Sequence, residues 1–189
     1  MDLNIEPENV VIPQETRDKW QNIVNILVKV MNIPSALIMK VDFPSFVVFQ
    51  SADSPENPFK AGQVFELPAG IYCEKTMATK DKLLIPNALK DPEWDKNPSI
   101  PAGLISYLGF PIMYPNNKVF GTLCVLDKKE NAYSADLEDV MRQFKELIES
   151  HLELLWERAF LLNFVKQQQA NEKQLKEKIS SLGELKKDC

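Results

Sequence analysis

The side chains of this chain that are best suited to chemistry are three cysteines and one histidine. Cys73 stands before Glu74, Cys124 lies in an apolar run, Cys189 is the last residue, and His151 falls in a long helical pattern. A cysteine thiolate can attack an electrophile, and a histidine can serve as its base. Three cysteines are too few, and too odd in number, for a disulfide framework. Their use favours a reducing, cytoplasmic compartment.

These residues do not combine into a catalytic or metal-binding motif. A Ser-His-Asp or Cys-His arrangement would have to use His151, whose spacing from Leu147 and Leu154 indicates instead the boundary of a helix interface. There is no CxxC, HExxH or histidine cluster for a metal, and no GxxxxGK[ST] or GxGxxG loop for a phosphate. The sequence therefore predicts a protein that is not an enzyme and binds no metal ion, and it leaves any cofactor unspecified.

The composition excludes two further classes of partner. The net charge is −5, so there is no basic excess to neutralise the phosphates of a nucleic acid. No apolar stretch approaches the roughly 20 residues that span a bilayer. Residues 1–6 also lack the charged and apolar regions of a signal peptide. We therefore expect a cytoplasmic protein with one hydrophobic core.

The elements that must position these side chains follow from the apolar periodicity. Residues 14–31 repeat apolar side chains three and four positions apart, which is typical of an amphipathic helix. Short β-branched and aromatic runs predict strands near 35–41 and 46–50, and two further strands near 107–113 and 118–127. The last two strands are joined by a turn that contains Asn116 and Asn117, residues that tolerate positive φ.

The middle of the chain is rich in turn formers. Residues 51–70 read as a loop, and a short helix follows at 71–79. Residues 86–101 hold four prolines, at positions 86, 92, 98 and 101, so a long regular element is not expected there. A loop of this length in a compact domain is usually functional or disordered.

From Ser134, which suits a helix N-cap, one helical pattern runs beyond residue 180. Such a helix is more than about 65 Å long at 1.5 Å per residue, so its C-terminal half must project from the domain. A stripe of apolar side chains is predicted to face the core: Phe144, Leu147, Ile148, Leu152, Leu155, Ala159 and Leu162. A looser seven-residue repeat remains beyond that stripe: Leu154, Leu161, Val165, Leu175, Ile179 and Leu182. This repeat predicts a homodimer through a parallel coiled coil, with a solvated tail as the alternative.

A series of short motifs resembles the GAF domain, in particular its bacterial sensory subgroup. The motifs are Tyr72-Cys73-Glu74, Leu84-Ile85-Pro86-Asn87-Ala88, Lys90-Asp91-Pro92-Glu93-Trp94, Asn97-Pro98, Leu108-Gly109-Phe110-Pro111-Ile112 and the strand Phe120 to Asp127. The resemblance implies an α+β fold: a central antiparallel β-sheet flanked by helices, with a long C-terminal signalling helix. It divides the chain into an irregular lead-in (1–13), a GAF domain (14–163) and a helical or coiled-coil extension (164–189).

The resemblance also implies where a ligand would bind. In GAF folds it lies between one sheet face and the irregular segments that precede the last two strands. Side chains alternate along a strand, which places Phe120, Thr122, Cys124 and Leu126 on one face and Val119, Leu123 and Val125 on the other. The Thr122 and Cys124 face would be the pocket side. Tyr72 and Cys73 would cap the pocket, and Trp94 and Tyr107 would close its rim; the alternative is that all six residues fill a solid core.

Three specialised branches of the family match less well. Free methionine-R-sulfoxide reductases carry a catalytic cysteine where this chain has residues 102–105, and an acidic pair where it has Cys124 and Leu126. Bilin-binding members use a cysteine followed by a histidine, and neither Cys73 nor Cys124 has that neighbour. The Asn-Lys-Phe-Asp-Glu signature of the cyclic-nucleotide branch is absent as well.

The sequence therefore predicts a sensory domain that binds an unidentified small molecule and relays the signal to an output domain or partner through a dimeric helix. A ligand-free dimerisation or scaffold module is the alternative, and a reductase comes third.

Overall fold

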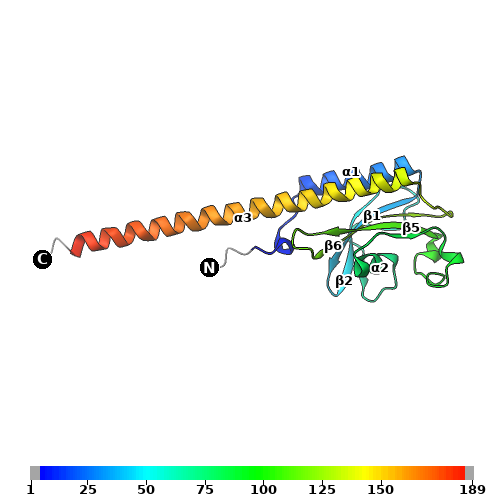
Figure 1. Cartoon of the computed structure of the whole chain (residues 1–189), viewed down its shortest axis with the longest axis horizontal. Coiled ribbons are helices and arrows are strands. Elements are labelled where there is room, and N and C mark those ends of the chain that lie inside the picture. Colours follow the sequence, from blue (N-terminus) through cyan, green and yellow to red (C-terminus); the bar gives the residue numbers. More distant parts are fainter. Residues whose placement is uncertain (1–4, 186–189) are drawn as a thin grey trace.

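An antiparallel sheet separates two layers of helices and loops (Figure 1). The computed structural model describes residues 5–185, with side chains up to residue 179. The sheet has six strands in the order β3-β2-β1-β6-β5-β4, and every neighbouring pair is antiparallel. The strands are β1 (Ser35–Asp42), β2 (Ser45–Ser51), β3 (Val64–Glu66), β4 (Leu83–Ile85), β5 (Ser106–Met113) and β6 (Val119–Asp127).

The four long strands confirm the expected α+β architecture. The turn between β5 and β6 has Asn117 at φ 61, as its residue type predicts. Two strands were not predicted, β3 and β4, which have three residues each. A three-residue edge strand shows almost no alternation, so only its pairing with β2 or β5 defines it.

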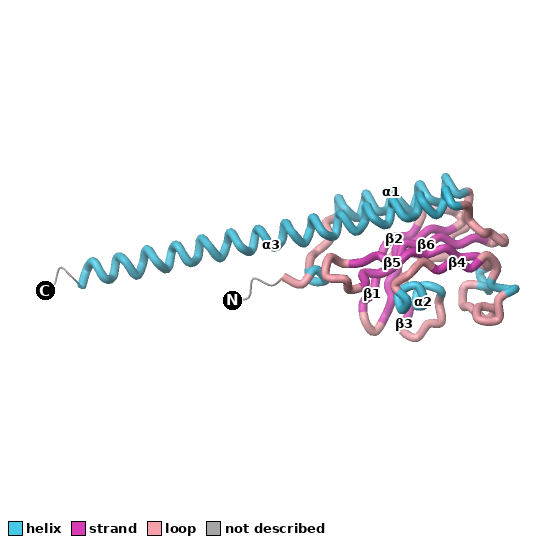
Figure 2. The backbone as a smooth tube through the Cα atoms, viewed as in Figure 1, coloured by secondary structure: helices cyan, strands magenta, loops and turns pink. Residues whose placement is uncertain are grey.

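Two helices cover one face of the sheet, α1 (Gln14–Met31) and α3 (Ala135–Leu185), and they run side by side (Figure 2). Their core centres on Trp20, which is fully buried and packs edge-on against Phe120 with ring centroids 5.6 Å apart. The Trp20 indole N–H donates to Nδ1 of His151 at 3.1 Å. The histidine therefore lies at the boundary between the two helices, as expected, and not in the projecting half of α3.

The other face carries α2 (Tyr72–Thr79), the 3₁₀ turns η2 (Ala88–Lys90) and η3 (Ile100–Ala102), and irregular chain. The expected short helix is confirmed. The N-terminal lead-in is less irregular than expected, because a 3₁₀ turn, η1 (Pro7–Asn9), buries Pro7. Ile5 accepts a hydrogen bond of 2.7 Å from the Trp156 indole N–H of α3.

The predicted face of Phe120 was wrong, because β6 contains a β-bulge at this residue. Gly121 pairs with Ile112, whereas Val119 pairs with Met113, so Phe120 is an extra residue. The bulge shifts the pleat by one position. Phe120 therefore packs with Trp20 on the helix face and Val119 on the α2 face. Beyond the bulge the prediction is correct, because Cys124 and Leu126 face α2 while Leu123 and Val125 face the helices.

Helix α3 has 51 residues, about 75 Å at 1.5 Å per residue, and its second half extends away from the domain (Figure 1). Met141, Ile148 and Leu152 are buried against the sheet and α1. Leu147 and Leu162, predicted to face the core, are 44% and 53% exposed. The reason is that the buried stripe is narrow and ends where α3 leaves the sheet. Among the described residues, no helix is long and apolar enough to cross a membrane.

Candidate ligand-binding site

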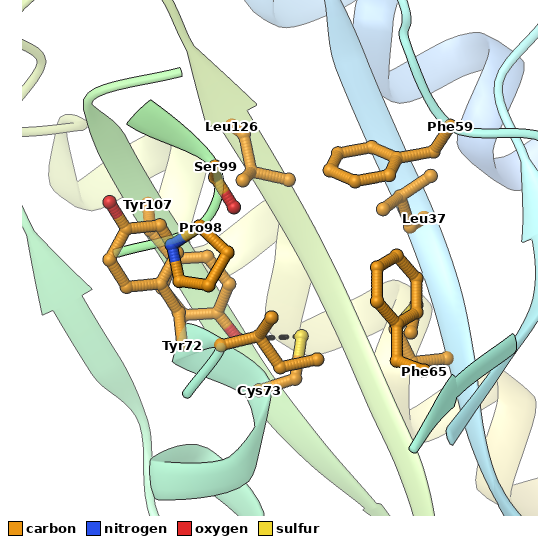
Figure 3. Close-up of a pocket in the computed structure, with 11 residues that line it drawn as sticks. Leu37, Phe59, Phe65, Tyr72, Cys73, Pro98, Ser99, Tyr107 and Leu126 are labelled. Atoms are coloured by element: carbon orange, nitrogen blue, oxygen red, sulfur yellow. Dashed lines mark hydrogen bonds between the residues drawn. The ribbon is translucent and has the colours of Figure 1, made fainter. Parts of the chain in front are cut away.

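A cavity of about 50 Å³ lies between the sheet and the layer that contains α2 (Figure 3). It is lined by Leu37, Met39, Phe59, Phe65, Ile71, Tyr72, Cys73, Pro98, Ser99, Tyr107 and Leu126. Phe59 and Phe65 lie on one side, and Tyr72 and Pro98 lie opposite them. The space suits a few water molecules and is small beside the roughly 300–1,000 Å³ of a pocket for a drug-sized ligand. A larger molecule would need the lining to move.

Three of the six predicted residues line this cavity, and the other three lie next to them. Tyr72, Cys73 and Tyr107 line it directly. Thr122 and Cys124 do not line it; both are fully buried, and Cys124 lies behind Cys73. Trp94 packs on the Tyr72 ring with centroids 5.1 Å apart and lines a groove outside the cavity. Whether any of the six binds a ligand remains a prediction.

Sequence reasoning missed the aromatic wall formed by Phe59 and Phe65. Both rings come from the segment that we interpreted as a loop, and their centroids are 6.2 Å apart. The buried side chain of Asn57 positions Phe59, because its amide donates to Ser51 Oγ and to the Ala52 carbonyl, both at 2.8 Å. An Asn-Pro-Phe sequence inside a polar loop was the one available signal, since Asn side chains commonly fix turns.

A second buried asparagine positions the segment opposite Phe59. The Asn97 amide donates to the Gly70 carbonyl at 3.0 Å, and its oxygen accepts from the Ser99 N–H at 2.9 Å. These bonds hold Pro98 and Ser99 against the chain that leads into α2. Two residues of the proline-rich stretch 86–101, Pro98 and Ser99, therefore form part of the cavity wall.

Sulfur and hydroxyl groups gather at the floor of the cavity. Sγ of Cys73 lies 3.7 Å from Sγ of Cys124, and the Tyr107 hydroxyl donates to the Cys73 sulfur at 3.6 Å. Oγ1 of Thr76 lies 3.0 Å from the same hydroxyl. This geometry requires a glycine at position 109, because a Cβ there would overlap the Tyr107 hydroxyl.

The two thiols are not equivalent. The hydrogen bond from the Cys124 thiol lowers the pKa of Cys73 against the effect of burial, and the hydroxyls of Thr122 and Tyr107 act in the same direction. The same hydrogen bond, together with burial, raises the pKa of Cys124 well above its usual range. The surroundings of the two thiols therefore favour the thiolate at Cys73 over the thiolate at Cys124.

Two hydroxyls near the cavity lack ordinary hydrogen bonds. Among the described residues, neither the Tyr72 hydroxyl nor Thr122 Oγ1 has a hydrogen-bond partner of normal geometry. The Thr122 hydroxyl still lies close enough to lower the pKa of both Cys73 and Cys124. Burial raises the pKa of Tyr72 to about 12, so its hydroxyl keeps its proton at neutral pH. In Figure 3 this hydroxyl points away from Phe59 and Phe65, so the Tyr72 ring, and not its hydroxyl, borders the cavity.

The family model described as "GAF domain" matches residues 16–152, which include the whole sheet and the first part of α3. The chain belongs to the GAF domain family. No curated protein matches its sequence.

Solved GAF domains share the fold at low sequence identity. The GAF domain of an Acinetobacter phosphoenolpyruvate-protein phosphotransferase is 19% identical, with a TM-score of 0.60, over 76% of this chain and 85% of that one. The GAF domain of Thermosynechococcus elongatus PixJ, in its blue-light-absorbing form, is 17% identical with a TM-score of 0.61, over 84% and 92% of the two chains. The type II free methionine-R-sulfoxide reductase of Thermoplasma acidophilum is 12% identical with a TM-score of 0.59, over 79% and 97%.

These relatives are a GAF domain of a phosphotransferase, a light-absorbing GAF domain and a reductase, and at such identities the likeness shows the fold alone. The function of this GAF domain must therefore be argued from its own residues.

Proposed function

We propose that this GAF domain is a cytoplasmic sensor without enzymatic activity, which binds a small molecule in the cavity and relays its presence through a dimer of α3. The observation that carries the proposal is a mostly apolar cavity, bordered by aromatic rings and a few polar side chains, between the sheet and the layer that contains α2. An apolar lining with a few polar groups is the usual make-up of a small-molecule site.

The lining indicates the class of molecule. Leu37, Phe59, Phe65 and Leu126 offer apolar contact, and polar atoms come only from the Tyr, Cys and Ser side chains and the backbone. None of the lining side chains carries a formal charge at neutral pH. These features favour a small, uncharged, largely apolar ligand with one polar group.

A route from the cavity to α3 runs through the neighbouring strands β5 and β6. On β5, Tyr107 faces the cavity and Leu108 faces the core beneath the helices. On β6, Leu126 faces the cavity and Val125 faces that core. The Glu149 carboxylate of α3 accepts from the backbone N–H of Met113 at 2.8 Å. A ligand that moves Tyr107 therefore acts on β5, a strand that contacts α3 directly. Two arrangements of α3 with different ligand affinities would complete the relay.

The projecting half of α3 supports the proposed dimer. Leu154, Leu161, Val165, Leu175 and Ile179 are each 50–62% exposed. Pairing two such helices would bury these side chains in a seven-residue repeat. The side chain of Leu182, the last member of the repeat, lies outside the described residues. An output domain or a signalling partner would then read the state of the helix pair.

Ligand binding can be tested on the full chain. Native mass spectrometry of the protein as purified would reveal a retained small molecule, and a metabolite library would be screened by thermal shift. Ser99→Leu projects an apolar side chain into the cavity and is expected to abolish both signals. The same change at the exposed Ser150 is the matched control. If no compound raises the Tm and no molecule is retained, the sensor proposal fails.

The dimer is tested separately by sedimentation at tens of micromolar. Leu161→Glu places charge in the proposed seam and is expected to yield a monomer, whereas Ala170→Glu, on the opposite side of the repeat, is expected to leave the dimer intact. A wild-type monomer at this concentration would contradict the proposed relay.

A ligand-free dimerisation module is the second candidate. The specific observation in its favour is the small volume of the cavity, about 50 Å³. It predicts the same dimer, with no ligand and no effect of Ser99→Leu beyond stability.

A further inference from the structure

Two thiols from elements far apart in the sequence meet in the interior of this domain. Cys73 lies on α2 and Cys124 on β6, both are free, and their sulfurs are 3.7 Å apart. A disulfide has an S–S distance of about 2.0 Å, so the sulfurs need to approach by roughly 1.7 Å. Small rotations of the two side chains, or a slight shift of the eight-residue helix α2, can supply that distance.

Only one of the two thiols faces the cavity. Cys73 lines it, whereas Cys124 is fully buried behind Cys73. A reagent that enters from the cavity therefore meets Cys73 first. Two groups within hydrogen-bonding distance can stabilise a thiolate there, the Cys124 thiol at 3.7 Å and the Tyr107 hydroxyl at 3.6 Å. A reactive thiol beside a second thiol is the arrangement of a reversible redox pair.

We infer that Cys73 and Cys124 form a redox-responsive dithiol, in which a small hydroperoxide oxidises Cys73 from the cavity and Cys124 then closes a disulfide between α2 and β6. The cavity suits this oxidant, because it accommodates molecules of about the size of water. The inference does not depend on the proposed small-molecule ligand or on the dimer.

The chemistry balances in two steps. The Cys73 thiolate attacks one peroxide oxygen and breaks the O–O bond, and the leaving hydroxide takes up the proton that Cys73 released, so a sulfenic acid and one water form. The Cys124 sulfur then attacks the Cys73 sulfur and breaks its S–O bond. The expelled hydroxide takes the Cys124 proton as a second water. Two thiols and one hydrogen peroxide thus give one disulfide and two waters.

The disulfide would change the cavity itself. The Cys73 sulfur accepts the hydrogen bond from the Tyr107 hydroxyl (dashed in Figure 3). When this sulfur moves towards Cys124, Tyr107 loses that acceptor and keeps only Thr76. Oxidation would therefore tie α2 to the sheet and alter one wall of the cavity.

The test uses the full chain with Cys189→Ser, which removes the third cysteine. Reduced protein is treated with hydrogen peroxide, denatured, and alkylated before mass spectrometry. The expected result is a loss of alkylation at both cysteines, a mass about 2 Da lower for the two hydrogens removed, and a peptide that links positions 73 and 124 within one chain. Dithiothreitol should restore both thiols. If both thiols remain alkylatable under peroxide that fully oxidises free glutathione, or if the link joins two chains, the inference is wrong.

Two single variants assign the roles. Adding Cys124→Ser should leave a sulfenic acid at Cys73, about 16 Da heavier and trapped by dimedone, whereas adding Cys73→Ser should leave Cys124 unreacted. Circular dichroism confirms that each variant is folded. Equal trapping in both variants would overturn the assignment of Cys73 as the attacking thiol. Reaction with tert-butyl hydroperoxide as fast as with hydrogen peroxide would overturn the entry through the cavity.

Discussion

Gly109→Ala offers the sharpest test of how the cavity wall is built. Gly109 lies in β5 with an ordinary backbone conformation, and Tyr107, two residues before it, points to the same face. A Cβ at position 109 would lie inside van der Waals contact of the Tyr107 hydroxyl and Cζ, and 2.7 Å from Cε1. The alanine therefore requires the Tyr107 ring to move.

Any movement of the Tyr107 ring costs stability. Tyr107 is fully buried, its centroid is 4.9 Å from that of Tyr72, and its hydroxyl bonds with Thr76 and Cys73. Overpacking a core costs about 1–3 kcal/mol, and each lost hydrogen bond about 0.5–1.5 kcal/mol. Replacing a glycine recovers about 0.4–1 kcal/mol through the unfolded chain. We therefore expect a net loss of about 2–3 kcal/mol, which lowers the Tm by roughly 4–12 °C in a chain of this size.

The assay is urea denaturation of four proteins: wild type, Gly109→Ala, Tyr107→Phe and the double variant. Tyr107→Phe alone should cost about 1 kcal/mol for its hydrogen bonds. In the alanine background it also removes the closest overlap, so the two changes should be non-additive by at least about 0.5 kcal/mol. A Gly109→Ala protein with unchanged stability, or strict additivity, would refute the reasoning.

Thr122→Val removes an unpaired buried hydroxyl and should leave the free energy of unfolding unchanged or raise it by about 1 kcal/mol. Thr122→Phe should lower it by about 1–3 kcal/mol, because this residue does not line the cavity and the larger side chain overpacks the core. Urea denaturation measures both variants, and a Thr122→Phe protein more stable than Thr122→Val would contradict the packing described. Burial, and then the charge of Lys19, lower the pKa of His151 below its usual 6.5. The unfolded chain therefore binds the proton first, so stability is fully present above about pH 6.5 and falls as the pH decreases through and below that value. His151→Gln, which can still accept from Trp20, should flatten the melting profile between about pH 7.5 and 5.5, and an unchanged slope would exclude this histidine as its cause. In a thioredoxin-coupled assay with free methionine-R-sulfoxide, we expect no turnover, and a rate near 1 per second or faster, typical of enzymes, would contradict the sensor proposal.

The sequence by itself determined the helices and strands whose residue pattern extends over enough positions to be recognised. Helix α1 could be predicted because burial on one side imposes a period of 3.6 over many residues. The four long strands could be predicted because they are short apolar runs rich in β-branched and aromatic residues, and only β2 among them alternates between buried and half-buried positions. The long helix α3 could also be predicted, because no proline interrupts it and acidic residues in its first turn indicate where it begins. The motif order around α2 and β6 was sufficient to place the cavity on the correct face of the sheet.

Tertiary structure decided the features that depend on pairing between distant residues. The bulge at Phe120 arises from the register between β5 and β6, which no local pattern encodes. Phe59 reaches the cavity because Asn57 is buried against β2, a contact across the loop. Cys73 and Cys124 are 51 residues apart in sequence, and only the packing of α2 on the sheet brings their sulfurs together. Local periodicity specifies which face of an element is buried, but not which side chains from other elements meet it there.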